Sequence, residues 1–147
     1  MGIISTLVFN SYLVRSKIMK HLGIFVGDAI ENILHNRKTI EGRFTIEKIL
    51  PFGKIKMGDE ILLKQSGGEI IGRVEVDNVL FYENLDGEAI GKLRKEYGKE
   101  MCVGDDYWKE KSSATVASII FLKNPQRFLM PLKSKKKDRR SWVLMED

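Results

Sequence analysis

Three charged side chains stand close together in the sequence, at Lys38, Glu41 and Arg43. Side chains on a strand alternate between two faces, so Glu41 and Arg43 would share one face, which Lys38 could reach from the corner before the strand. Ile40 and Phe44 would then face the core. Such a cluster can hold a phosphate, a carboxylate or a nucleobase edge, because glutamate accepts from base amino groups and arginine offers a planar fork of donors. The alternative is a ladder of surface salt bridges, which contributes little to the stability of a fold.

A short helix and a strand are expected to position these residues. The apolar spacing predicts a helix over residues 28–36, with Asp28 as its N-cap. Residues 39–46 alternate as a strand does. Within that strand, Gly42 indicates either a bulge or a close approach of another segment to the backbone.

Further strands separated by glycine turns complete the pattern. The predicted strands are residues 22–26, 61–64, 69–81, 115–122 and 141–145, and the predicted helices are residues 86–98 and 105–112. Runs of short strands of this kind are typical of a barrel or a sandwich. The expected fold class is therefore α+β, a small mixed β-barrel with a few peripheral helices.

The positive charge is concentrated at the ends of the chain. The 147 residues carry a formal net charge of +5, yet residues 19–132 contain 17 basic and 17 acidic side chains. Residues 133–140 are expected to be a flexible basic loop with affinity for polyanions. A loop that only keeps the protein soluble is the alternative. The basic residues assigned to ligand binding here are Lys135, Lys136, Lys137, Arg139 and Arg140.

Composition narrows the classes of site that we expect. The single cysteine, Cys102, fits a reducing cytoplasmic compartment and excludes a zinc site built from cysteines. Two histidines are too few for a histidine metal cluster, and no apolar run approaches a membrane span of about 20 residues. We therefore expect no metal, no cofactor and no membrane partner. Residues 1–18 read as an extension ahead of one domain, residues 19–147, with Met19 as a plausible start.

Three segments together resemble the ASCH domain, a PUA-like family. Residues 33–43 are similar to its helix-to-strand motif, in which Lys38, Glu41 and Arg43 match the charged positions. Residues 55–63 resemble its Gly-Asp turn leading into a strand, and residues 70–76 resemble the strand that follows.

The resemblance implies a PUA-like barrel with a charged cleft that binds RNA or another nucleic acid. Some small bacterial members of the family are amidohydrolases that remove an acyl group from acetylated cytidine with a lysine, a threonine and a glutamate. Lys38 falls on that lysine, but Glu41 stands where the threonine would be, and Thr39 is displaced by two residues. This departure favours binding over catalysis.

The expected function is binding of nucleic acid, RNA in particular, or of a nucleotide-like small molecule. The alternative is hydrolysis of an acylated nucleoside, with Lys38 and Glu41 as the catalytic candidates. Trp142 either contacts the nucleic acid or closes the barrel core, and Tyr107 and Trp108 are expected to anchor a helix. The oligomeric state stays open. The binding residues predicted outside the basic loop are Arg37, Lys38, Thr39, Glu41, Arg43 and Trp142.

Overall fold

The computed structural model describes residues 17–134 and 138–145. No helix in the described part of the chain is long and apolar enough to cross a membrane. The elements in chain order are β1 (Lys20–Phe25), α2 (Ala29–Leu34), β2 (Ile40–Thr45), β3 (Glu60–Gln65), β4 (Ile70–Tyr82), α3 (Gly87–Met101), α4 (Asp105–Glu110), β5 (Val116–Leu132) and β6 (Trp142–Met145).

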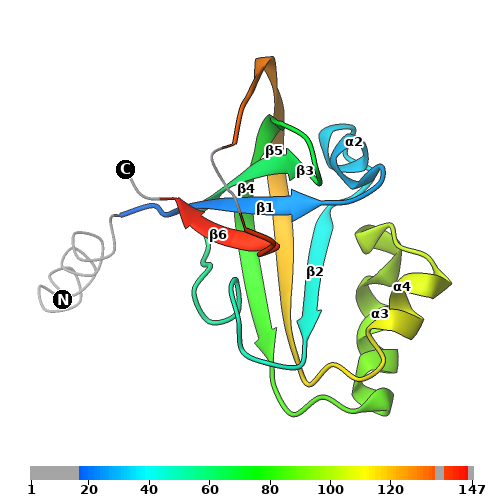
Figure 1. Ribbon diagram of the computed structural model, residues 1–147. Coiled ribbons are helices and arrows are strands. Elements are labelled where there is room, and N and C mark those ends of the chain that lie inside the picture. Colours follow the sequence, from blue (N-terminus) through cyan, green and yellow to red (C-terminus); the bar gives the residue numbers. More distant parts are fainter. Residues whose placement is uncertain (1–16, 135–137, 146–147) are drawn as a thin grey trace, which may run out of the picture.

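The six strands of the described residues form one curled sheet, a half-barrel, with the order β2-β5-β4-β3-β1-β6 (Figure 1). Strands β1 and β3 run parallel and the other neighbours run antiparallel. The mixed sheet with its peripheral helices confirms the predicted α+β, PUA-like fold class. Strand β2 and the β1–β6 pair lie at opposite edges of the sheet. Because these edges share no backbone ladder, contacts between them depend on side chains.

Apolar side chains on the two faces of the sheet form two cores. One lies inside the curl and includes Phe25, Ile61, Val74 and Trp142. The other lies where α3 and α4 cover the outer face beside β2, and Ile40 and Phe44 belong to it, as the alternation predicts. Strand β2 therefore separates a helix-covered apolar face from an inner face that carries Glu41 and Arg43.

The N-cap residues of α3 and α2 differ in whether their side chains make the capping hydrogen bond. Asp86 caps α3, since its side chain accepts from the backbone N–H of Ala89 at 2.9 Å. Helix α2 is shorter than expected. Asp28 is its N-cap residue, as predicted, but the Asp28 side chain makes no cap hydrogen bond.

Gly42 is a point of close approach rather than a bulge, because β2 pairs with β5 in unbroken register. A Cβ at this position would lie 2.4 Å from Cε of Met101, at the end of α3. The helix therefore rests on β2 at this glycine, one residue from Glu41.

Candidate functional site

Lys38, Glu41 and Arg43 form one continuous ion network. Nζ of Lys38 lies 3.0 Å from Oε1 of Glu41, and Nε of Arg43 donates to Oε2 at 2.6 Å. Lys38 Nζ also donates to the backbone oxygen of Met101 at 2.5 Å. The motif residues thus meet as the strand alternation predicts, and the end of α3 supplies an additional acceptor.

Arg43 bridges the two ends of the strand order. Its NH2 group donates to the backbone oxygen of Ile24 at 2.9 Å, and its NH1 group donates to that of Ser141 at 3.3 Å. The guanidinium carbon lies 5.0 Å from the ring centroid of Phe25 and 4.9 Å from that of Trp142. We call this place, formed by Arg43, Ile24 and Ser141, the Arg43 seam. It joins the motif on β2 to the residue that follows the basic segment.

Burial decides between the two interpretations of the charged cluster. The side chains of Lys38, Glu41 and Arg43 are 3%, 9% and 16% exposed. A surface ladder of salt bridges would be solvated, so that alternative is wrong. Two charges taken out of water are tolerated only when their geometry and hydrogen bonds are good, which the short contacts here provide.

The charge of Glu41 is held by its neighbours. Burial by itself raises the pKa of this carboxyl, but the charges of Lys38 and Arg43 and their hydrogen bonds outweigh that effect and lower the pKa below its usual value. Glu41 is therefore an anion between two cations, and the site carries net positive charge.

Tyr107 and Trp108 anchor α4 to the sheet, as predicted. The Tyr107 hydroxyl donates to the backbone oxygen of Gly42 at 2.9 Å, and Trp108 packs edge-on against Phe44. Burial and the nearby charge of Glu41 raise the pKa of Tyr107. This phenol therefore stays a neutral donor at physiological pH.

Where the structure describes them, the other predicted polar site residues take no side-chain part in the network of Lys38, Glu41 and Arg43. Arg37 is exposed, and its Nε donates to Oδ1 of Asn32 at 2.8 Å. Thr39 contributes its backbone, which donates to Glu100 and accepts from Leu122. Arg139 and Arg140 are exposed, and Arg140 pairs with Asp138. The remaining predicted binding residues, Lys135, Lys136 and Lys137, lie outside the described residues.

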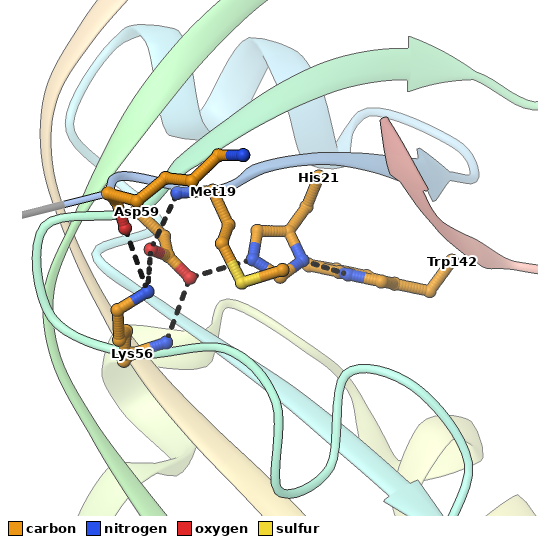
Figure 2. Close-up of polar contacts among 6 residues, drawn as sticks. Met19, His21, Lys56, Asp59 and Trp142 are labelled. Atoms are coloured by element: carbon orange, nitrogen blue, oxygen red, sulfur yellow. Dashed lines mark hydrogen bonds and ion pairs between the residues drawn. The ribbon is translucent and has the colours of Figure 1, made fainter. Parts of the chain in front are cut away.

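A second buried polar network joins His21, Asp59 and Trp142 (Figure 2). Nε2 of His21, on β1, lies 2.8 Å from Oδ2 of Asp59, directly before β3. Nε1 of Trp142 donates to Nδ1 of His21 at 3.0 Å. Asp59 also accepts from the backbone N–H of Met19 and from both the backbone N–H and the Nζ of Lys56. His21 and Asp59 have no exposed surface.

The Trp142 indole N–H determines which ring nitrogen of the neutral His21 carries the proton. Because Trp142 can only donate, Nδ1 of His21 must accept, so the single proton of the neutral ring lies on Nε2 and is donated to Asp59. Burial lowers the pKa of His21, in spite of the hydrogen bond and charge of Asp59, which raise it. Trp142 is 2% exposed and belongs to the core, so the expectation that it contacts nucleic acid directly is wrong. Instead, its indole supports the Arg43 guanidinium.

Sequence reasoning missed this second network for a simple reason. His21 is one polar residue in an apolar strand, and Asp59 reads as part of a turn. The two residues are 38 positions apart, so no local sequence pattern links them. The only available signal was a lone histidine in a buried strand, which requires a partner.

The seam retains some capacity to bind. Arginine has five N–H donors, and the three contacts to Glu41, Ile24 and Ser141 use three of them. Ser118 pairs with Arg43 across β2 and β5, so the two side chains share the inner face. Its Oγ is buried and has no hydrogen-bond partner among the described residues. The arrangement is suited to recognising an anion or a polar edge. In the described part of the chain, His, Cys, Asp and Glu side chains form no group that could hold a metal ion.

Comparison with known proteins relates this geometry to solved structures. No family model and no curated protein matches the chain. The structure of ASCH from Zymomonas mobilis superposes with a TM-score of 0.67 at 14% identity, covering 86% of this chain and 87% of that one. Protein EF3133 from Enterococcus faecalis gives a TM-score of 0.54 at 12% identity, with 85% and 94% covered. The hypothetical protein PH0355 gives a TM-score of 0.51 at 25% identity, with 73% and 99% covered.

These similarities concern the arrangement of elements more than the residues. The six-stranded half-barrel, the helices beside β2 and the motif at the start of β2 agree with the resemblance seen in the sequence. The chain therefore has the ASCH-domain fold, a small α+β fold of the PUA-like kind.

Proposed function

We propose that this protein binds nucleic acid, and RNA in particular, at the Arg43 seam, with the basic segment 133–140 adding phosphate contacts. The observation that carries the proposal is the hydrogen bond from Arg43 to Ser141. This bond brings Ser141, the residue that follows the basic segment, to the charged motif, although Arg43 and Ser141 are 98 residues apart in the chain. A polyanion held by the segment would therefore lie beside the seam.

The chemistry of the two parts is complementary. The basic segment has six Lys or Arg residues and one Asp, so it attracts phosphates without regard to sequence. The seam offers a guanidinium held rigid by Glu41 and supported by two aromatic rings, which suits a phosphate or a base edge. Nonspecific attraction and local recognition are thus divided between two neighbouring regions.

Salt-dependent binding of a fluorescent single-stranded RNA tests the proposal. In a variant with Lys133, Lys135–Lys137 and Arg139 changed to Gln, we expect weaker binding. The slope of log K against log salt should fall by roughly 0.7 for each phosphate contact removed. The matched control changes Lys92, Lys95 and Lys99, exposed on α3, to Gln. It should leave the slope unchanged.

The seam is tested by Arg43→Lys, which keeps the charge but loses the planar fork. We expect RNA affinity to fall roughly tenfold, with the salt slope maintained. An exchange for glutamate is unsuitable, because it would set a second carboxylate against Glu41. Folded wild-type protein that does not bind RNA at low salt would refute the proposal.

The second candidate function is hydrolysis of an acylated nucleoside. It is favoured by the contact between the buried Lys38 amine and the Glu41 carboxylate, two groups of the kinds that serve in acid–base catalysis. Incubation with a panel of acylated nucleosides, followed by chromatography, separates the two functions. Turnover that disappears in Lys38→Ala would establish the hydrolase in place of simple binding.

A further inference from the structure

The far end of β5 leaves the sheet as a short apolar finger. Arg127 pairs with Gly72 and Leu132 pairs with Ile70, so four residues of β5 stand opposite the single residue Ile71 of β4. Residues 128–131 therefore loop out of the ladder. In Figure 1 this orange end of β5 extends beyond the turn that joins β3 to β4. We call residues 128–132 the apolar finger.

The finger presents apolar side chains to water. Leu129 is fully exposed at 103%, Met130 is 76% exposed and Leu132 is 49% exposed. Phe128 and Pro131 complete an uninterrupted apolar run. A loop outside the ladder has no packing need for apolar residues, so their presence indicates a partner that removes them from water.

The root of the finger is held firmly, which suits a protrusion that must push into its partner. Arg127 forms an ion pair with Glu31 of α2, with NH2 2.5 Å from Oε1. At Gly72 the strands approach so closely that a Cβ would lie 2.6 Å from the backbone oxygen of Gln126. The finger thus projects from a fixed base.

Positive charge follows the finger directly. Lys133 is exposed, and five further basic residues lie between positions 135 and 140 in the sequence, with Asp138 as the only acid. An apolar tip next to cations matches a partner that has an apolar interior and an anionic exterior. Stacked bases enclosed by phosphates have this character.

We infer that the apolar finger is a wedge that inserts between neighbouring bases of the bound nucleic acid. The inference rests on the proposed function and adds a mode of recognition to it. Leu, Met, Phe and Pro are the side chains that proteins insert between base steps, where they replace base stacking with apolar contact. Lys133, exposed directly after the finger, would contact a flanking phosphate during insertion. A convex tip suits insertion, whereas a groove would suit a docked peptide.

The test uses the full chain and a helical stem with 2-aminopurine at one step, whose fluorescence rises when stacking is lost. RNA and DNA stems of the same sequence are compared, to separate the two sources of stacked bases. We expect the wild type to raise the fluorescence of at least one stem. Leu129→Ser with Met130→Ser should abolish that rise and weaken binding about tenfold. The salt slope should stay the same, because no charge changes.

The matched control is Ile46→Ser with Met57→Ser, two residues outside the finger that are 64% and 66% exposed. It should behave as the wild type, and all variants should melt at the wild-type temperature. Binding without any fluorescence rise, or a rise that survives in the finger variant, would overturn the wedge alone. Failure of the wild type to bind either stem or single-stranded RNA would overturn both the wedge and the proposed function. A finger variant that loses only binding to phosphatidylserine vesicles would also overturn the wedge and indicate a membrane contact.

Discussion

Glu41 is the residue on which the charged site depends. It is the only anion in contact with both Lys38 and Arg43 within the described chain, and all three side chains are largely buried. Its two carboxylate oxygens are divided between the cations, one each. Removal of this charge would leave two cations in a poorly solvated place, which costs far more than the loss of an exposed ion pair.

We therefore expect Glu41→Gln to lower the free energy of unfolding by about 3–5 kcal/mol. The matched control is Glu83→Gln, which removes the exposed pair between Lys48 and Glu83 and should cost about 1 kcal/mol or less. Urea denaturation measures both. If the destabilisation reflects the uncompensated charge, addition of Lys38→Met to Glu41→Gln should recover part of it. Equal costs for Glu41→Gln and Glu83→Gln would contradict this account.

At the scale of elements, β5 organises the molecule. Its first part pairs with both β2 and β4, and its last part pairs with β4 alone before the finger loops out. The predicted strand ended at residue 122, where the apolar run gives way to the polar residues Lys123 and Asn124 and to Pro125. Pairing of Lys123 with Glu75 and of Gln126 with Arg73 extends the ladder through that signal. Tertiary pairing thus overrides the local pattern.

Gly72 allows this extension, since the carbonyl of Gln126 occupies the place of a side chain. Gly72→Ala should cost about 1–3 kcal/mol, because a backbone atom must move to relieve the contact. The matched control is Gly91→Ala, at an exposed site of α3 with nothing within 4 Å, which should stabilise by about 0.5–1 kcal/mol. Thermal melts compare the two. Similar melting temperatures for both variants would show that the close approach imposes no constraint.

Whether a contact could be predicted from the sequence depends on how far apart its two residues lie in the chain. Strand alternation placed Glu41 and Arg43 on one face, because that rule needs only neighbouring residues. The contacts of Lys38 with Met101 and of Arg43 with Ser141 span 63 and 98 residues. No local pattern encodes such pairs, and the family resemblance supplied the residues without their partners.

For the whole molecule, two buried networks hold the ends of the sheet together. The Arg43 seam joins β2 to β1 and to the start of β6. In the second network, His21 and Asp59 join β1, the start of β3 and Trp142 of β6. The Trp142 indole contacts both networks, through its hydrogen bond to His21 and its ring beside Arg43. The stability of the fold should therefore respond to the protonation of His21.

The direction in which stability changes with pH follows from the direction in which the pKa of His21 is shifted. The pKa of His21 in the folded protein lies below the unfolded value of 6.5, so the unfolded state binds more protons as the pH falls. This contribution to stability is complete above about pH 7 and is lost as the pH falls through 6.5 towards the folded pKa. Protonation of Nδ1 would also replace the acceptor of the Trp142 N–H with a second donor. Asp59 and Glu41, whose pKa values are also lowered, lose their contributions at more acidic pH.

Urea denaturation at pH 7.5, 6.5 and 5.5 should show the midpoint falling with pH in the wild type. In His21→Gln the side-chain amide can still donate to Asp59 but does not titrate, so the midpoint should fall less over the same interval. The fluorescence of Trp142 offers a local readout, with Trp108→Phe as the background that leaves it the only tryptophan. A wild-type midpoint that stays constant from pH 7.5 to 5.5, or an equal fall in His21→Gln, would show that His21 does not link the fold to pH.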